Sequence, residues 1–140
     1  MPSKANLWNS AAYSRYDVSG MNAKNEFVHK SVYDPSPVGY KLGPQAAFNG
    51  FTTSNFTWSD ATATTPAGRT YNNDLFFPAI GYLNNTDRAL TGYGSIYYRS
   101  ANPTYSLYFT NTTVNTSQTG FGTAHAGPLR PILQYTGYPF

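Results

Sequence analysis

The side chains that most often carry out catalysis or hold metal ions are few in this chain. It has two histidines, His29 and His125, no cysteine, and six acidic residues in a length of 140. The immediate neighbours of His29 are Val28 and Lys30, and those of His125 are both alanine. Zinc sites need several Cys, His or carboxylate ligands together, so the sequence predicts no metal site and no cysteine nucleophile.

The remaining acidic side chains leave one catalytic alternative open. Asp60, Asp74 and Asp87 could supply the carboxylate pair of a glycoside hydrolase, although each also suits a cap or turn position, which is the reading we prefer. The chain lacks a Gly-x-Ser-x-Gly nucleophile elbow, and its short glycine pair Gly120-Phe121-Gly122 is expected to be a turn. The few acids argue against sugar binding through a calcium ion, and calcium binding itself is left as an open alternative. We therefore expect no catalytic residue, no cofactor and no enzymatic activity.

Aromatic and neutral polar side chains are abundant where charged ones are scarce. The chain has 13 Tyr and 9 Phe, and 11% of its residues are charged, against about 25% in an average domain. Tyrosine combines a large contact area with a polar tip, and binding surfaces use it for that reason. The basic residues are scattered singly, whereas nucleic-acid binding needs clusters. The composition favours a binding surface and argues against a nucleic-acid partner.

The spacing of apolar residues indicates short elements in one domain of residues 1–140. No apolar run approaches the roughly 20 residues of a membrane span, so no membrane insertion is expected. With 12 Gly and 10 Pro, long helices are improbable. Residues 44–48 are the best helix candidate, because Pro44 suits a first turn and Gly50 an end, and residues 10–16 are a weaker one.

Strand signals are stronger than helix signals. The aromatic and β-branched stretches predict strands at residues 75–77, 79–80, 96–98, 105–109 and 129–133. Pro78 is tolerable only at a sheet edge or bulge. Residues 52–73 are expected to be a loop with a short hairpin, and residues 34–39 a rigid turn. Phe76, Phe77 and Ile80 are expected in the core, and Leu107 is expected on a buried strand face that leaves Tyr108 open.

Three stretches, in this order, carry a resemblance to a known family. They are KSVYDPSPVGY (residues 30–40), FFPAIGYL (76–83), and a C-terminal region from Gly94 to Ile132 that contains SIYYRS, YSLYF and GPLRPI. Together they resemble the ligand-displaying domains, of C-type-lectin fold, of the variable proteins of diversity-generating retroelements. Formylglycine-generating enzymes share that superfamily, but this chain has no catalytic cysteine. Ser36, Leu83 and Tyr98 depart from the family's cysteine, arginine and tryptophan.

The resemblance implies an α+β fold of C-type-lectin type, with short helices, a small twisted antiparallel sheet and much ordered loop. It also implies that strands from the two ends of the chain lie side by side, and that residues of about 91–125 form a variable, ligand-binding face. The residues expected to face the ligand are Tyr93, Ile96, Tyr98, Arg99, Asn102, Thr104, Tyr105, Tyr108, Thr119, Phe121 and His125. If that face is free of structural duties, replacing Tyr98, Arg99 or Tyr105 by alanine should hardly change stability.

The function implied is display of a binding surface on a phage tail protein or surface adhesin, outside the cell or on a virion. The expected partner is a protein or glycan on a target cell surface, and homo-oligomers are possible. A structural subunit of a fibre, pilus or virion is the alternative. Obligate assembly through the binding face would favour that second interpretation.

Overall fold

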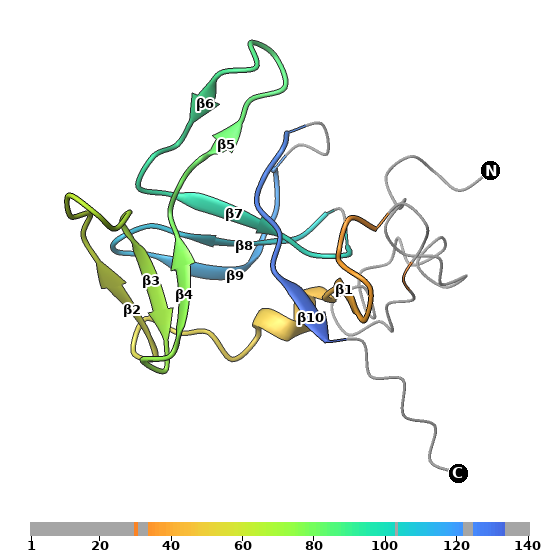
Figure 1. The fold of residues 1–140 in the computed structure, drawn as a ribbon, viewed down its shortest axis with the longest axis horizontal. Helices are drawn as coiled ribbons and strands as arrows, with labels where there is room; N and C mark the ends of the chain where they lie inside the picture. The colour runs from red at the N-terminus through yellow and green to blue at the C-terminus, as the bar shows by residue number, and fades with distance from the viewer. Residues whose placement is uncertain (1–29, 31–33, 103, 122–124, 134–140) are drawn as a thin grey trace.

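Short antiparallel strands are the main regular structure of the residues that the structure describes. The structure, a computed structural model, describes residues 30, 34–102, 104–121 and 125–133 (Figure 1). The elements are β1 (Tyr40–Leu42), the 3-10 helix η3 (Gln45–Phe48), β2 (Phe56–Ser59), β3 (Gly68–Tyr71), β4 (Leu75–Pro78), β5 (Tyr82–Leu83), β6 (Leu90–Thr91), β7 (Ile96–Arg99), β8 (Ser106–Phe109), β9 (Val114–Gln118) and β10 (Pro131–Leu133).

These strands form two small sheets and two ribbons. The three-stranded sheets are β2–β3–β4 and β7–β8–β9, and the two-stranded ribbons are β1–β10 and β5–β6. All of these pairings are antiparallel. Figure 1 shows the β5–β6 hairpin projecting above the β7–β8–β9 sheet.

The expected α+β class is wrong, because the described part of the chain is mainly β. Strand accounts for 39% of it and helix for 4%. The predicted helix at residues 44–48 forms only the single 3-10 turn of η3, whose N-cap Pro44 makes no side-chain capping bond. The second helix candidate, residues 10–16, lies outside the described residues. The composition itself favours this outcome, because Thr, Tyr and Phe suit strands and the frequent Gly and Pro interrupt helices.

The β7–β8–β9 sheet buries one face against the β2–β3–β4 sheet. Ile96 and Tyr98 alternate along β7, and Leu107 and Phe109 along β8, so these four side chains share a face. All are at most 3% exposed. They pack with residues of the other sheet and of η3 in one hydrophobic cluster, whose buried members are Phe48, Phe56, Phe77, Ala79, Ile96, Tyr98, Leu107 and Phe109.

The expected pairing of strands from the two ends of the described chain is confirmed. Tyr40 lies opposite Leu133, and Leu42 opposite Pro131. The preceding turn is held by Asp34, whose buried carboxylate accepts hydrogen bonds from the backbone N–H groups of Ser36 (2.8 Å) and Leu42 (2.9 Å). Burial alone would raise the pKa of Asp34, but these bonds and the ammonium of Lys30, 3.9 Å away, outweigh it and hold that pKa below its usual value.

The predictions for individual strands and core residues are confirmed in part. β4 ends at Pro78 and is an edge strand, as the proline requires, and residues 52–73 contain the β2–β3 hairpin. Phe77 is 1% exposed, but Ile80 follows β4 and is 44% exposed, so its expected place in the core is wrong. The strand predicted at residues 79–80 does not form, and β1, β5, β6 and β9 were not predicted. Their sequences are short or rich in Asn, Thr and Ser, and their strand structure comes from pairing with neighbours.

Candidate functional site

The structure places several of the expected ligand-facing residues in the interior. Ile96, Tyr98, Arg99, Asn102 and Phe121 are at most 6% exposed. Ile96 and Tyr98 belong to the core cluster, and the Asn102 carboxamide oxygen accepts a hydrogen bond from the backbone N–H of Thr104, 2.9 Å away, in the β7–β8 turn. The expectation that these five residues contact a ligand is therefore corrected, because none of them reaches the surface.

The other expected residues remain accessible. Tyr93, just before β7, is 72% exposed. Thr104 and Thr119 are also exposed, and Tyr105, Tyr108 and His125 are half-buried. Two of these six, Tyr108 and His125, are joined through shared aromatic neighbours.

A stack of rings covers the outer face of the β7–β8–β9 sheet. The ring centroids of Tyr108 and Tyr97 are 4.6 Å apart, and those of Tyr97 and Phe121 are 4.4 Å apart. The centroids of Phe121 and His125 are 5.2 Å apart. Tyr82 of β5 stands edge-on against Tyr97, Phe121 and His125, at 5.0–5.5 Å. We call these five residues the aromatic stack. Phe121 is buried inside it, and the other four are half-buried.

Sheet register explains why the stack lies on one face. Tyr97 is directly opposite Tyr108, and Tyr108 is directly opposite Asn115 of β9, so the three side chains form a row across the sheet. A β-bulge between β8 and β9 then brings Gln118 opposite Ser106, which restores it to the same face as Asn115. The Asn115 amide nitrogen donates to the Gln118 carboxamide oxygen at 2.8 Å, so the aromatic row continues into an ordered pair of amides.

Arg99 supports the stack from beneath. Its guanidinium lies 4.3 Å from the centre of the Phe121 ring, and its Nη2 donates to the carbonyl oxygen of His125 at 2.7 Å. Burial lowers the pKa of Arg99 to about 10, so it stays charged at neutral pH. Arg99 thus holds the segment that carries Phe121 and His125 against the sheet, which is a positioning role.

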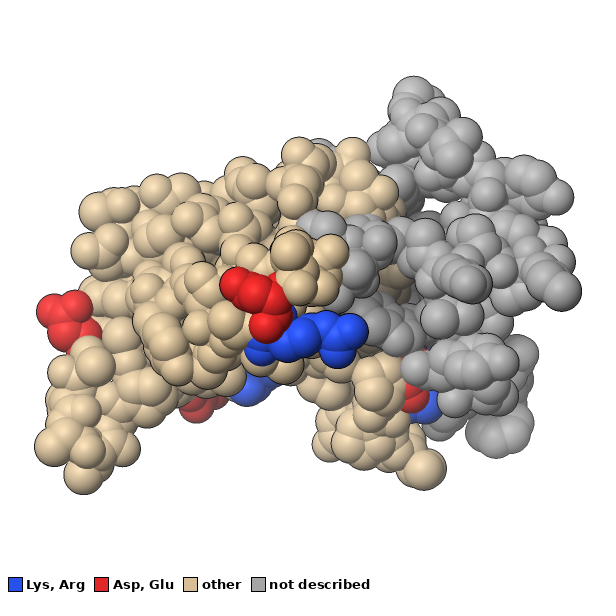
Figure 2. All heavy atoms as spheres, turned by 90° about the horizontal axis from the view of Figure 1, so that it is seen from above, with Lys and Arg blue, Asp and Glu red and all other residues tan. Residues whose placement is uncertain are grey.

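The site is almost free of formal charge. Burial raises the pKa of Tyr97, and the neighbouring Tyr108 and Tyr82 add to the shift, so its hydroxyl remains a neutral donor and acceptor. Figure 2 shows few charged side chains on the face seen from above, with an acidic and a basic one side by side near its middle. Within the described residues no group of three or more His, Cys, Asp or Glu side chains comes together. The arrangement offers ring faces, hydroxyls and amides for contact.

No protein-family model matches the chain, and neither the curated proteins nor the solved structures contain a match to it. The functional assignment therefore depends on the geometry of the chain itself. None of the described helical structure is long and apolar enough to cross a membrane.

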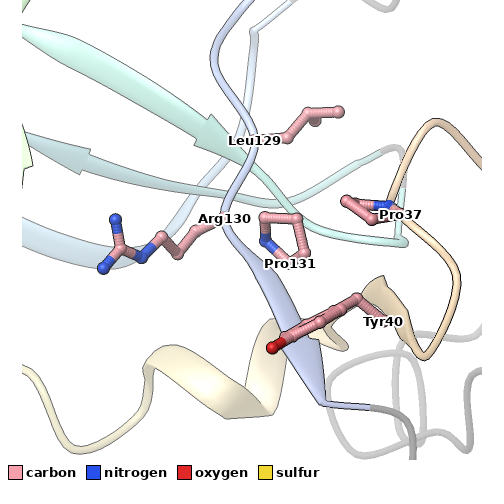
Figure 3. A pocket seen from close by; sticks show the side chains of 5 residues that line it. All are labelled: Pro37, Tyr40, Leu129, Arg130 and Pro131. Atoms are coloured by element: carbon pink, nitrogen blue, oxygen red, sulfur yellow. The ribbon is translucent and has the colours of Figure 1, made fainter.

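A separate hollow lies between the 34–39 turn and β10. It measures about 360 Å³ and is lined by Pro37, Tyr40, Leu129, Arg130 and Pro131 (Figure 3). Figure 3 shows the Arg130 side chain directed away from the other four, and its guanidinium lies 5.0 Å from the centre of the Phe77 ring. The hollow is thus walled by apolar groups with few polar atoms to select a ligand, and we assign it no role.

The sequence prediction missed Tyr82, Tyr97, Asn115 and Gln118. Tyr97 had a signal, since alternation along the strand puts it on the face opposite Ile96 and Tyr98. Tyr82 lies outside the expected variable region and reaches the stack only through the fold. The two amides depend on the bulge, which no residue pattern in β9 announces.

Buried Tyr98 makes stability depend on alkaline pH. Burial raises its pKa to about 12, against a modest opposing effect of the Arg130 charge. An unfolded tyrosine ionises near pH 10, so between pH 10 and 12 only the unfolded state loses this proton and stability falls by about 2–3 kcal/mol. Tyr98→Phe lacks this hydroxyl, so its free energy of unfolding should fall by about 2–3 kcal/mol less than that of the unmodified protein between pH 10 and 12, as measured by urea denaturation. At pH 7 it should cost about 1 kcal/mol or less, for the 3.3 Å bond to the Pro78 carbonyl. If the free energies of unfolding of the two proteins fell in parallel as the pH rises, this prediction would be contradicted.

Proposed function

We propose that the protein is a non-enzymatic ligand-binding domain that displays the aromatic stack, with Tyr82, Tyr97, Tyr108 and His125 as its contact residues. Its expected setting is a phage tail protein or surface adhesin, outside the cell or on a virion. The expected partner is a protein or glycan on a target cell surface. The resemblance to the variable proteins of diversity-generating retroelements points the same way.

The observation that supports the proposal most is a partly exposed set of rings on a strand pair whose other face is buried. The opposite face of the same strands is the hydrophobic core, with Ile96 and Leu107 fully buried. Rings held in this way present a large contact area and lose little entropy on binding. A purely structural cluster would bury its rings, as it does Phe121, whereas Tyr97 and Tyr108 keep part of their surface open.

The test is to replace Tyr108, the ring at the open end of the stack. Tyr108 contacts one other ring of the stack, Tyr97, so Tyr108→Ala should lower stability by no more than about 1 kcal/mol. Removing an aromatic anchor from a binding surface costs about 1–2 kcal/mol, so binding should weaken by about 5–30-fold. The fluorescently labelled protein is titrated onto a panel of bacterial strains and scored by flow cytometry, with thermal unfolding measured in parallel.

Tyr40→Ala is the matched control. Tyr40 is a tyrosine in β1, 43% exposed, in a different sheet from the stack. It should bind cells as the unmodified protein does. Equal losses for Tyr40→Ala and Tyr108→Ala would show that the stack is not the binding surface. Absence of binding to every strain would count against the display function.

One observation favours the alternative, a structural subunit of a fibre, pilus or virion. Leu83 and Leu90 are directly opposite each other in the β5–β6 hairpin and are 45% and 48% exposed. An exposed apolar pair is a ready contact for assembly. Light scattering after size exclusion separates the two functions: a stable oligomer that the double variant Leu83→Ser/Leu90→Ser dissolves supports the structural subunit, and a monomer supports display.

A further inference from the structure

A second hollow lies beneath the tip of the β5–β6 hairpin, next to the aromatic stack. It measures about 340 Å³ and is lined by Leu83, Asn84, Asn85, Arg88 and Ala126. One wall is built by the backbone pairing of Leu83 with Ala126, whose N–H and C=O groups exchange hydrogen bonds of 2.9 and 3.1 Å. The wall is thus firm, and the polar residues of the hairpin tip close the hollow from the other side.

The asparagine side chains that line this hollow have engaged acceptors, whereas their amide donors have no hydrogen bond to a described residue. The Asn84 carboxamide oxygen accepts from the backbone N–H of Thr86 at 2.9 Å, which orients the Asn84 NH₂ the other way. The Asn85 carboxamide oxygen accepts from the Thr86 hydroxyl at 3.5 Å. The Asn85 backbone N–H donates to Nδ1 of His125 at 3.1 Å. The side-chain NH₂ groups of both asparagines and the guanidinium of Arg88 have no recorded partner among the described residues.

The backbone of Arg88 adopts a conformation that is unfavourable for arginine. Its φ is +59°, a left-handed conformation in which glycine or asparagine is the usual residue. The turn needs this conformation, because the Arg88 N–H donates to the carbonyl of Asn84 (3.0 Å) and the Asn84 N–H donates to that of Ala89 (3.0 Å). An arginine at such a position contributes a charged side chain that the turn itself does not need.

No carboxylate of the described residues lies close enough to Arg88 to form an ion pair with it. Asp87 precedes Arg88, but its carboxylate accepts from the backbone N–H of Ala89 at 2.9 Å, and the described residues contain no Asp87–Arg88 ion pair. A ligand that suits the hollow must therefore bring acceptors and a negative charge. From this geometry we propose that the hollow binds a carboxylate: Arg88 takes it with two parallel N–H groups, the asparagine amides donate to it, and Leu83 and Ala126 contact its carbon skeleton.

The carboxylate of an acidic sugar and that of a peptide side chain present the same chemistry. The test titrates the isotope-labelled protein by NMR with two matched pairs: 3′-sialyllactose against lactose, and N-acetylglutamate against N-acetylglutamine. The acid of at least one pair should bind about 10-fold or more tightly than its neutral partner, because a charge-assisted bidentate contact is lost in the latter. Amide signals of Asn85, Arg88 and Ala126 should shift. The pair with the larger preference identifies the source of the carboxylate.

Variants of the hairpin tip separate this binding from folding. Arg88→Gln and Arg88→Gly should both abolish the preference for the acid, while Arg88→Gly should unfold at the same or a higher temperature, because glycine relaxes the left-handed backbone. Asp87→Asn should bind the acid more tightly, since a competing negative charge is removed. Lys41→Gln, which changes the net charge equally on the distant β1 strand, should bind as the unmodified protein does.

The results that overturn the carboxylate site are equally specific. They are equal binding of acid and neutral partners, no binding of either acid at millimolar concentration, an Arg88→Gln variant that keeps its preference, or a Lys41→Gln variant that loses it. Tyr108→Ala should leave carboxylate binding unchanged, because no stack residue lines the hollow. The outcome is therefore independent of whether the aromatic stack binds cells.

Discussion

Phe77→Ala should lower the free energy of unfolding by about 3–5 kcal/mol, the range expected when a buried phenylalanine leaves a cavity. Phe77 is 1% exposed in β4. Its ring meets Phe56 edge-on at 5.3 Å and Tyr98 edge-on at 5.1 Å, and so joins the β2–β3–β4 sheet to the β7–β8–β9 sheet. Urea denaturation followed by tyrosine and tryptophan fluorescence measures the loss.

Leu75→Ala is the control for this measurement. Leu75 lies in the same strand, but it is 38% exposed and belongs to no recorded hydrophobic cluster of the described residues. Its replacement should cost about 0.5 kcal/mol, as surface substitutions do. If Phe77→Ala cost as little as Leu75→Ala, the two sheets would not share the core that we describe.

The position of Tyr98 reverses an expectation drawn from the sequence. As a ligand-facing residue it would be replaceable at little cost, but its ring packs edge-on against Phe77 and stacks on Phe109. Alternation along β7 predicts that Tyr98 and Arg99 point to opposite faces of the sheet, because they are consecutive in a strand. Both therefore could not face a ligand. Sequence alone could not say which face is the core, since that depends on where the β2–β3–β4 sheet packs.

Local patterns predicted the strands that carry their own signal. β7, β8 and β10 were foreseen from aromatic and β-branched residues, and β4 from Leu75 to Phe77. β9 (Val114–Gln118) was not foreseen, because its Asn and Ser residues have low strand preference. Its strand structure comes from pairing with β8. The α-helical content that the resemblance implied failed, and the helix predicted from Pro44 and Gly50 forms only one 3-10 turn.

The candidate site was foreseen in its region but not in its composition. Tyr108, Phe121 and His125 were expected on the binding face and do meet in the aromatic stack, through Tyr97 and Tyr82. Tyr82 is about 40 residues from His125 in sequence, and such contacts arise only when the β5–β6 hairpin folds over the sheet. Non-local contacts of this kind have no signature in the local sequence, which is why the expected residue set mixed stack, core and turn positions.

The structural role of Arg69 could not be predicted from the sequence. Arg69 counts there as one of several scattered basic residues, yet in the structure it is 3% exposed. Its guanidinium donates to the backbone carbonyls of Thr110 (2.8 Å), Asn111 (3.0 Å) and Phe56. It thereby ties the β2–β3–β4 sheet to the turn between β8 and β9. Burial lowers its pKa, and carbonyl dipoles, rather than a carboxylate, compensate the charge.

Arg69→Gln should therefore cost about 3 kcal/mol or more, because it removes charge-assisted bonds and leaves buried carbonyl oxygens without a donor. Arg69→Lys should recover only part of this loss, since one ammonium cannot reach carbonyls on both sides as a planar guanidinium does. Arg130→Gln is the matched control: Arg130 is half-buried and lies over the Phe77 ring, a contact worth about 0.5–1 kcal/mol. Equal costs for Arg69→Gln and Arg130→Gln in urea denaturation would mean that the two sheets are held by ring packing alone. A much larger cost at Arg69 would show that a buried cation, hydrogen-bonded to backbone carbonyl groups, is part of what joins them.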